Sequence, residues 1–319
     1  MSELITSAQN PKIKKLLALQ QKSSERRECG LFVVEGVREL QHCIDAGFTV
    51  DSVFIRKGSP VAGACPATSG MAMPTLGHFR GRDEGEPRTL PAPNSIPGPS
   101  HKAKPINGSG MELDTGKARS EAKMQWRVFE VSPEVYEKIA YRGSTEGVIA
   151  EVRTREMHLE DLELKENPLI MVLESVEKPG NLGAILRSAD AAGADAVIVC
   201  DPLTDLFNPN LIRSSIGGIF SVPTVACSSE QAIRWLKANR IQILTAQLQD
   251  SSYYYDTDMR KGTAIVMGTE ATGLTDIWRE AADAHILIPM LGRLDSLNVS
   301  VSAAILLFEA VRQRSCNNG

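Results

Sequence analysis

The fold of this chain is decided by residues 169–200, which read LIMVLESVEKPGNLGAILRSADAAGADAVIVC. Two apolar runs, 169–173 and 196–200, are rich in β-branched residues and predict buried strands. A glycine-containing turn and a helical segment lie between them. The same alternation continues, with further strands expected at 222–226, 241–246, 264–267 and 285–289. This alternation predicts an α/β domain over 165–315 with a largely parallel sheet, whose ligands bind beyond the carboxyl ends of the strands.

The composition is that of an ordinary globular protein. Hydrophobic residues make up 42% and charged residues 23% of the 319 residues, which is enough for two domains with a core each. No apolar run is long enough to span a bilayer, and the first residues lack the apolar core of a signal peptide. The 6 cysteines form no CxxC pair, which argues against a zinc site and a disulfide scaffold. We therefore expect a cytoplasmic protein with no membrane and no metal partner.

Charge is distributed unevenly along the chain. The net charge of −4 gives no overall signature of nucleic-acid binding. The first 27 residues nevertheless carry a surplus of four positive charges, from Lys12, Lys14, Lys15, Lys22, Arg26 and Arg27 against Glu3 and Glu25. This segment either meets phosphates or forms the solvated face of a helix, and the charge pattern alone favours neither.

Residues 1–56 and 124–155 predict a second, smaller α/β domain that contains a long insertion. Its helices are expected at 11–21, 37–46 and 133–141, and its strands at 31–35, 50–55, 126–131 and 147–152. The insertion, 57–123, has no apolar periodicity, and 9 of the chain's 17 prolines lie between Pro60 and Pro105. Such a segment cannot bury enough apolar surface to offset its ordering entropy, so we predict that it is disordered.

Three loops in the C-terminal half combine polar residues with glycines. The first carries Asn181 and Arg187 at the opening of a helix, where free backbone N–H groups and the helix dipole attract anions. Asp201, at the end of the next strand, also fits the acidic residue of a dinucleotide-binding turn. Gly180 and Gly183 do not complete the GxGxxG pattern of such a turn. This loop by itself leaves both interpretations open.

The second loop, residues 268–274, reads GTEATGL. It is also explained as an ordinary helix start, with Thr272 or Thr275 as the cap and Glu270 near the positive end of the helix.

The third loop, residues 288–305, reads IPMLGRLDSLNVSVSAAI. Ser296 or Asn298 is expected to begin a helix rich in small residues. Tight packing at a subunit interface explains the small residues, but it does not require the whole SLNVS string.

Together these loops resemble the three motifs of the SpoU, or TrmH, family of RNA ribose methyltransferases. The family patterns NxGAxxR, GxExxGL and IPMxGxxxSLNVS match residues 181–187, 268–274 and 288–300. The resemblance covers about residues 168–314. Nearer the N-terminus, SAQNPK, FVVEG and STEGV resemble the small L30e-like, ribosomal-protein-like RNA substrate-binding domain that often precedes the catalytic domain. The long insertion departs from that domain's usual length.

The resemblance implies a SPOUT-type α/β domain with a deep trefoil knot. It also implies S-adenosyl-L-methionine as the cofactor, held by three knot loops largely through backbone groups. By position, the cofactor contacts fall at Ala246, Gly268, Ile288, Met290 and Leu297. The implied reaction is methyl transfer to a ribose 2′-hydroxyl of structured RNA, with no metal required. The implied assembly is a homodimer whose active site is completed across the interface.

The resemblance assigns the catalytic positions to Asn181, Arg187, Glu270, Ser296 and Asn298. In the family the matching arginine is proposed to assist deprotonation of the hydroxyl. A guanidinium is effectively always protonated, so an anchor for the adjacent phosphate is a chemically easier role for Arg187. Asn181 and Glu270 are then expected to orient Arg187, while Ser296 and Asn298 shape the ribose pocket.

The paired N-terminal domain favours ribosomal RNA over transfer RNA as the substrate, which is an inference from architecture. Two other classes of protein compete with this interpretation. A catalytically silent RNA-binding protein is disfavoured because every polar motif position is filled. A nucleotide-dependent oxidoreductase is disfavoured by the incomplete glycine pattern and by the SLNVS string, which a dehydrogenase does not need.

Overall fold

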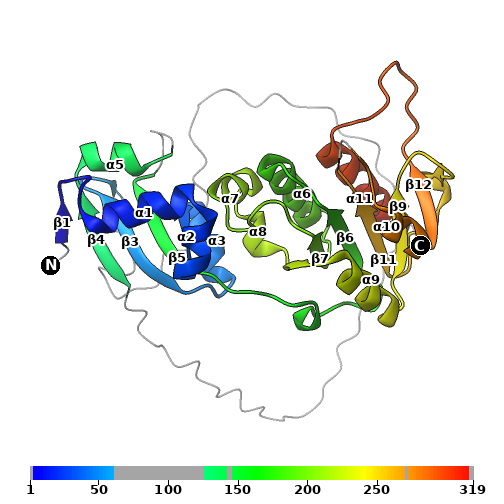
Figure 1. Ribbon diagram of the computed structural model, residues 1–319, viewed down its shortest axis with the longest axis horizontal. Helices are drawn as coiled ribbons and strands as arrows, with labels where there is room; N and C mark the ends of the chain where they lie inside the picture. The colour runs from blue at the N-terminus through cyan, green and yellow to red at the C-terminus, as the bar shows by residue number, and fades with distance from the viewer. Residues whose placement is uncertain (1–2, 61–125, 142–145, 270–271, 316–319) are drawn as a thin grey trace, which may run out of the picture. The chain divides into compact units, whose positions relative to one another are not determined.

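The computed structural model describes residues 3–60, 126–141, 146–269 and 272–315, which form two β-sheets flanked by helices (Figure 1). The insertion predicted to be disordered lies outside the described residues, apart from its first four residues, Lys57 to Pro60. Those residues form a turn, in which the N–H of Ser59 donates to the carbonyl of Arg56 at 3.0 Å. No helix in the described part of the chain is long and apolar enough to cross a membrane.

The first sheet mixes parallel and antiparallel strands. Its strand order is β1 (Glu3–Ile5), β4 (Arg127–Val131), β3 (Val50–Arg56), β5 (Val148–Arg153) and β2 (Leu31–Glu35). β5 pairs antiparallel with β3 and β2, while β1, β4 and β3 pair in parallel. The two strands that follow the insertion therefore lie between strands that precede it. The insertion interrupts this sheet and does not separate two sheets.

The helices beside the first sheet are α1 (Pro11–Gln21), α2 (Ser23–Cys29), α3 (Val37–Asp45) and α5 (Pro133–Ile139). Helix α1 begins where the sequence predicts, because the Asn10 side chain accepts the N–H of Lys12 at 2.9 Å and Pro11 has no N–H to satisfy. Its buried residues share one core with those of α5. The sequence does not predict α2, whose residues are nearly all polar. That helix ends at Gly30, which adopts the left-handed conformation.

All strands of the second sheet run parallel. Their order is β10 (Ser252–Tyr253), β12 (Ala284–Leu287), β9 (Gln242–Ala246), β11 (Thr263–Met267), β6 (Leu169–Glu174), β7 (Ala196–Cys200) and β8 (Thr224–Cys227). Every residue of β6, β7 and β11 is buried, as parallel strands covered on both faces require. The predicted α/β class with a largely parallel sheet is confirmed. The predicted domain boundaries stay a prediction.

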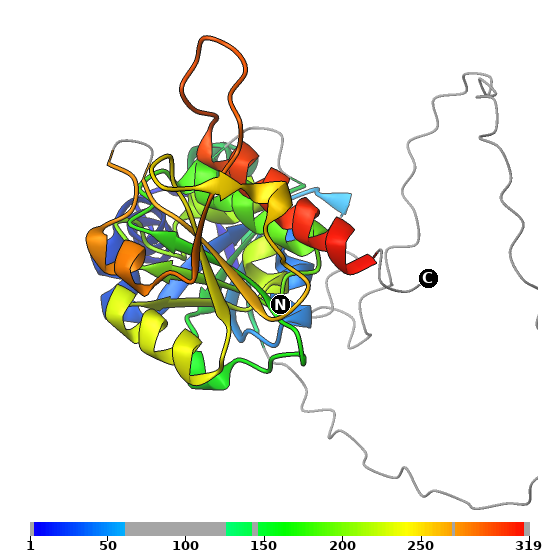
Figure 2. The same cartoon turned by 90° about the vertical axis from the view of Figure 1, so that its right-hand side faces the viewer.

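Helices cover both faces of the second sheet (Figure 2). They are α6 (Pro179–Ala191), α7 (Pro209–Ser215), α8 (Gly218–Ser221), α9 (Ser229–Ala238), α10 (Asp276–Ala281) and α11 (Val299–Ser315). Helices α6 and α11 pack against each other on one face. On the other face, Leu236 of α9 and Trp278 of α10 share a core with Ile170 and Val172 of β6. The alternate residues of β6 thus serve opposite faces.

Proline and short length account for the differences between the predicted and the observed strand boundaries. The strand predicted at 285–289 ends at Leu287, because Pro289 has no N–H with which to extend the ladder. The strand predicted at 222–226 begins at Thr224, directly after Pro223. The edge strands β1 and β10 are only 3 and 2 residues long, too short to give a periodic signal.

An aromatic cluster connects the first sheet to helices of the second. Phe32 of β2 stacks on Phe207, with 4.5 Å between ring centroids, and on Phe220 at 5.9 Å. Phe48 meets Phe220 edge-on at 5.3 Å. These pairings place the described residues in a single compact unit.

Arg26 reinforces this connection and is not available to phosphates. The residue is 3% exposed, its Nε donates to Asp205 at 2.6 Å, and its Nη1 donates to the carbonyl of Leu19 at 2.6 Å. Lys12 is also engaged, in an ion pair with Glu3 at 2.7 Å. The basic surplus of the first 27 residues is therefore smaller at the surface than the sequence indicates.

Replacing Arg26 with alanine is expected to destabilise the protein far more than replacing its neighbour Arg27, which is exposed. Arg26→Ala leaves the half-buried Asp205 carboxylate without its partner. We expect a loss of about 3 kcal/mol in the free energy of unfolding, the low end for a broken buried pair, because Asp205 keeps some contact with water. Urea denaturation measures both variants. A change within ~0.5 kcal/mol for Arg26→Ala would contradict the structural role of Arg26.

Candidate active site

Ala246, Gly268 and Ile288 lie at one edge of the second sheet. They stand at or directly after the carboxyl ends of β9, β11 and β12. β9 lies between the other two strands, and its Ala246 is in register with Ile286 of β12. Because neighbouring strands are about 4.8 Å apart, these three backbones fall within roughly 10 Å of one another. Small or apolar side chains at this edge leave the backbone groups as its main polar surface.

The loop after β11 closes on itself at Gly268. Thr269 and Gly273 exchange backbone hydrogen bonds of 3.2 and 3.0 Å, and Gly273 has a positive φ of 70°. A Cβ on Gly268 would lie 2.2 Å from the carbonyl oxygen of Gly273. Only glycine permits this approach. Glu270, the candidate catalytic residue of this loop, lies outside the described residues.

Gly183 in the first motif serves the packing of two helices. A Cβ there would lie 1.9 Å from Oγ of Ser214 and 2.7 Å from the backbone nitrogen of Ser215. Oγ of Ser214 in turn donates to the carbonyl of Pro179, the first residue of α6, at 3.1 Å. Helix α7 therefore fits against the first turn of α6. A Cβ on Gly180, by contrast, would meet nothing within 4 Å.

Asn181 and Asn298 connect the first motif with the third. Nδ2 of Asn298 donates to Oδ1 of Asn181 at 3.3 Å. Oδ1 of Asn298 accepts the backbone N–H of Ser300 at 3.0 Å, so this residue caps α11 as predicted. One amide thus starts a helix and contacts the other motif.

Arg187 lies farther along α6 with an exposed side chain. Among the described residues no hydrogen bond or ion pair engages its guanidinium, including none with Asn181. The expected orientation of Arg187 by Asn181 is therefore not seen, and Glu270, the other expected partner, is not described. The guanidinium is open to an external anion.

The remaining candidates lie in the segment between β12 and α11, which projects as a loop in both ribbon views (Figures 1 and 2). Ser296 is exposed, Leu297 is 37% exposed, and Met290 is half-buried near the start of the loop. Leu291 and Leu294 are 96% and 75% exposed. A loop with this much uncovered apolar surface is suited to close over a ligand or a second chain.

A buried carboxylate that the sequence analysis missed supports the second motif. Glu174 ends β6 and is 3% exposed. It accepts the N–H and the Oγ1 hydroxyl of Thr275 at 2.9 and 2.5 Å. Thr275 does precede α10, as predicted for a cap, but its hydroxyl contacts Glu174 and not the helix. A lone glutamate at a strand end gives no sequence signal for this role.

Asp201 takes part in the same network. Its Oδ2 accepts the N–H and the hydroxyl of Ser229 at 3.1 and 2.6 Å, and Nε1 of Trp278 donates to that hydroxyl at 3.0 Å. The aspartate that fits a dinucleotide-binding turn thus supports the start of α9. This structural role removes the main argument for the dehydrogenase interpretation.

Cys200 and Cys227 are neighbours in register on β7 and β8. The hydrogen bond to Cys227, together with burial, raises the pKa of the Cys200 thiol, and the same hydrogen bond lowers the pKa of Cys227. The two cysteines lie far apart in the sequence, so no CxxC motif predicts their hydrogen bond. In the part of the chain that the structure describes, no group of three or more His, Cys, Asp or Glu side chains could hold a metal ion.

Comparison with known proteins agrees with this geometry. The model of the SpoU rRNA Methylase family matches residues 168–308, and that of the MRM3-like substrate binding domain matches residues 10–69. The 23S rRNA (guanosine-2'-O-)-methyltransferase RlmB of Escherichia coli is 39% identical over 176 residues, which are 53% of this chain and 72% of the relative. The chain belongs to the SpoU rRNA methylase family. The resemblance seen in the three loops is confirmed.

Other members of the SpoU family extend the comparison. The 23S rRNA (uridine(2479)-2'-O)-methyltransferase of Streptomyces viridochromogenes is 35% identical over 173 residues, and the chain spans only 60% of its length. The AdoMet-bound rRNA methyltransferase from Sinorhizobium meliloti has 27% identity and a TM-score of 0.74, with 98% of each chain covered. The roles of individual residues in the SpoU motifs stay predictions.

Gly268→Ala is expected to disrupt the second SpoU motif, because its Cβ would collide with backbone atoms that cannot rotate away. Overpacking of this kind costs about 1–3 kcal/mol. Gly292→Ala in the third motif is the matched control, since nothing lies within 4 Å of a Cβ there. Thermal unfolding and limited proteolysis measure both variants. Equal behaviour of the two would refute the close approach at Gly268.

Proposed function

We propose that this chain is an S-adenosylmethionine-dependent methyltransferase that modifies a ribose 2′-hydroxyl of ribosomal RNA. The observation that carries the proposal is the convergence of its motifs. Gly268 and Ile288 flank Ala246 at one strand edge, and the other end of the third motif contacts the first through the Asn298–Asn181 bond. Relatives named as 23S rRNA 2'-O-methyltransferases support both the reaction and the choice of ribosomal over transfer RNA.

The carboxyl ends of β9, β11 and β12 suit S-adenosylmethionine, the ligand named for the Sinorhizobium structure. Gly268 lets the Gly273 carbonyl come closer than any Cβ would permit, so this part of the site presents backbone and no side chain. Ala246, Gly268 and Ile288 would hold the cofactor mainly through backbone groups, with Met290 and Leu297 as apolar cover. When bound, the cofactor supplies a methyl group already activated on a sulfonium.

The residues of this chain then need to position the ribose and manage its proton. Arg187 holds the phosphate next to the target ribose, because a guanidinium keeps its proton and makes two parallel hydrogen bonds to phosphate oxygens. Asn298 and Ser296 shape the ribose pocket together with Asn181, which Asn298 contacts, and the role proposed for Glu270 remains that of orienting Arg187. The hydroxyl proton is released to solvent as the methyl group is transferred.

Arg187→Ala is expected to lower methyl transfer to ribosomal RNA by about 100- to 1,000-fold, the usual effect of removing one preorganised charge-stabilising group. S-adenosylmethionine binding, measured by calorimetry, should stay within a factor of two or so because Arg187 does not touch the strand edge. Arg234→Ala, an exposed arginine on α9, is the matched control. Near-normal turnover by Arg187→Ala would sink the assignment, and absence of cofactor binding by the wild-type chain would instead favour a silent RNA-binding protein.

The trefoil knot is part of this proposal and rests on strand order. β10 follows β9 in the sequence, yet β12 lies between them in the sheet. The N–H of Gln247, directly after β9, donates to Ile286 of β12 at 3.0 Å. This order supports the proposed knot, because β12 lies between β9 and β10 and therefore next to the short connection that joins them. The cytoplasmic location expected from the sequence stays part of the same proposal.

A homodimer is the remaining element of the proposal. Val301 and Phe308 lie two turns apart on one face of α11 and are 47% and 48% exposed. An uncovered apolar face on a helix that is otherwise part of the core suits a two-fold interface. Its closeness to Asn298 would bring the second chain next to the active site.

Phe308→Asp is expected to convert the dimer to a monomer, because a carboxylate on this face would be desolvated at the interface. Light scattering on the eluting protein gives the mass. Leu203→Asp, at a residue that is 65% exposed elsewhere on the surface, should leave the dimer intact. A wild-type chain that is monomeric and fully active would contradict the proposal.

A further inference from the structure

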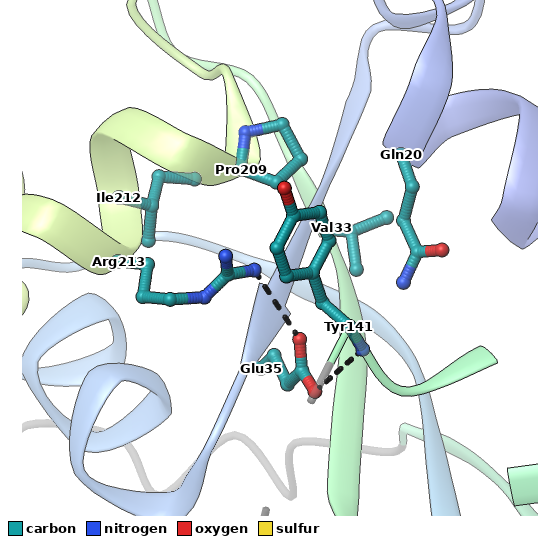
Figure 3. Close-up of a pocket in the computed structure, with 7 residues that line it drawn as sticks. All are labelled: Gln20, Val33, Glu35, Tyr141, Pro209, Ile212 and Arg213. Atoms are coloured by element: carbon teal, nitrogen blue, oxygen red, sulfur yellow. Dashed lines mark hydrogen bonds and ion pairs between the residues drawn. The ribbon is translucent and has the colours of Figure 1, made fainter. Parts of the chain in front are cut away.

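Tyr141 and Arg213 form an aromatic–guanidinium stack beside the first sheet (Figure 3). The central carbon of the Arg213 guanidinium lies 3.7 Å from the centroid of the Tyr141 ring. This is well inside the range of about 6 Å over which a cation is attracted to an aromatic face. Tyr141 follows α5 of the first sheet and Arg213 belongs to α7 of the second, so the stack draws on both.

Glu35 fixes both members of the stack (Figure 3). One of its carboxylate oxygens accepts the N–H of Tyr141 at 3.0 Å, and the other lies 3.6 Å from Nη2 of Arg213. Its side chain is only 11% exposed, which protects the ion pair from solvent screening. Glu35 therefore holds the Tyr141 backbone and the Arg213 guanidinium, and the guanidinium in turn lies over the ring.

The stack borders a cleft that is too small for a nucleobase. Val33, Glu35 and Pro209 help to line it, and its free space is on the scale of a water molecule. Tyr141 nevertheless remains 55% exposed although Arg213 covers one side of its ring. If the stack served only to join the two sheets, the contacts of Glu35 would be sufficient and the Tyr141 ring would be expected to be buried. The ring is exposed, so a purely structural contact does not account for it.

Helix α7 connects this stack rigidly to the candidate active site. Ser214, the residue after Arg213, donates to the carbonyl of Pro179 at the start of α6. Gly183 allows the two helices to approach until no Cβ fits between them. Because Arg187 lies on the same helix α6, a nucleotide held at Tyr141 would stand at a fixed distance from it.

We propose that Tyr141, backed by Arg213, is a platform on which an unpaired nucleobase of the RNA substrate stacks. The proposal rests on the proposed function as an RNA methyltransferase and names a positioning residue for it. Every base has a face that can stack on an aromatic ring, so the platform supplies affinity and register and not base identity. It favours single-stranded segments, since bases within a duplex are already stacked on each other.

The test compares Tyr141→Leu, which keeps apolar bulk but removes the aromatic face, with Tyr141→Phe, which keeps that face. The probe is a fluorescein-labelled single-stranded oligoadenylate, and its dissociation constant is measured by anisotropy without cofactor. We expect Tyr141→Leu to weaken binding roughly 5- to 150-fold, equivalent to ~1–3 kcal/mol, and Tyr141→Phe to bind as the wild type does. Methylation by Tyr141→Leu should show a raised KM for RNA with kcat nearly unchanged.

Tyr255→Leu is the matched control, because Tyr255 is 46% exposed and also stacked, on Tyr253. It should bind the oligoadenylate as tightly as the wild type. Tyr141→Leu with unchanged affinity, or with an equal loss for a duplex RNA of the same length, would overturn the platform. If Tyr141→Leu binds the single strand more weakly than the wild-type chain, but the wild-type chain does not methylate RNA, the platform is supported and the proposed function is refuted.

Discussion

The approach of α6 and α7 at Gly183 is the contact on which the rest of the arrangement depends. A single added methyl group would collide with Ser214 and the backbone of Ser215. Helix α6 carries Asn181 and Arg187, while the residues just before and within α7 reach the first sheet through Asp205 and Arg213. The absence of a side chain at Gly183 therefore sets the geometry between α6 and the part of the first sheet that α7 contacts. Interiors this tightly packed transmit position with little give.

Two hydrogen-bonded carboxylates at strand ends of the second sheet hold the starts of helices in place, whereas the proposed catalytic residue Arg187 is exposed. Glu174 and Asp201 lie at the carboxyl ends of β6 and β7, where a ligand would be expected in a parallel sheet. Glu174 accepts the backbone and hydroxyl donors of Thr275, just before α10, and Asp201 accepts those of Ser229, the first residue of α9. We propose the cofactor site at the carboxyl ends of β9, β11 and β12, where no carboxylate is buried among the residues that the structure describes. A cofactor with a cationic sulfonium and an uncharged adenosine would suit an edge made of backbone groups.

Individual helices and strands can be predicted from the sequence because they depend on local residue patterns, whereas strand order and long-range contacts cannot. Fully apolar strands such as β6 and β7 are predicted to within a residue, and α1 is predicted with its observed bounds. Strand order, the pairing of Cys200 with Cys227 and the burial of Arg26 depend on residues far apart in the chain. Candidate residues at strand ends, such as Ala246 and Gly268, can be located from the sequence because the strands themselves are predicted. The contact of Asn298 with Asn181 joins distant residues and is seen only in the structure.

The net charge of −4 constrains how this chain recognises RNA. A negative net charge provides no overall attraction for RNA, so local groups have to supply the contacts. The ion pair of buried Arg26 with Asp205 removes one positive charge from the basic segment, whereas the Lys12–Glu3 pair is already included in its surplus of four. In the proposed function, a phosphate anchor at Arg187 would fix the RNA backbone without reading its sequence. The proposed platform at Tyr141 would add a second contact, on an aromatic surface that α7 connects to the helix of Arg187.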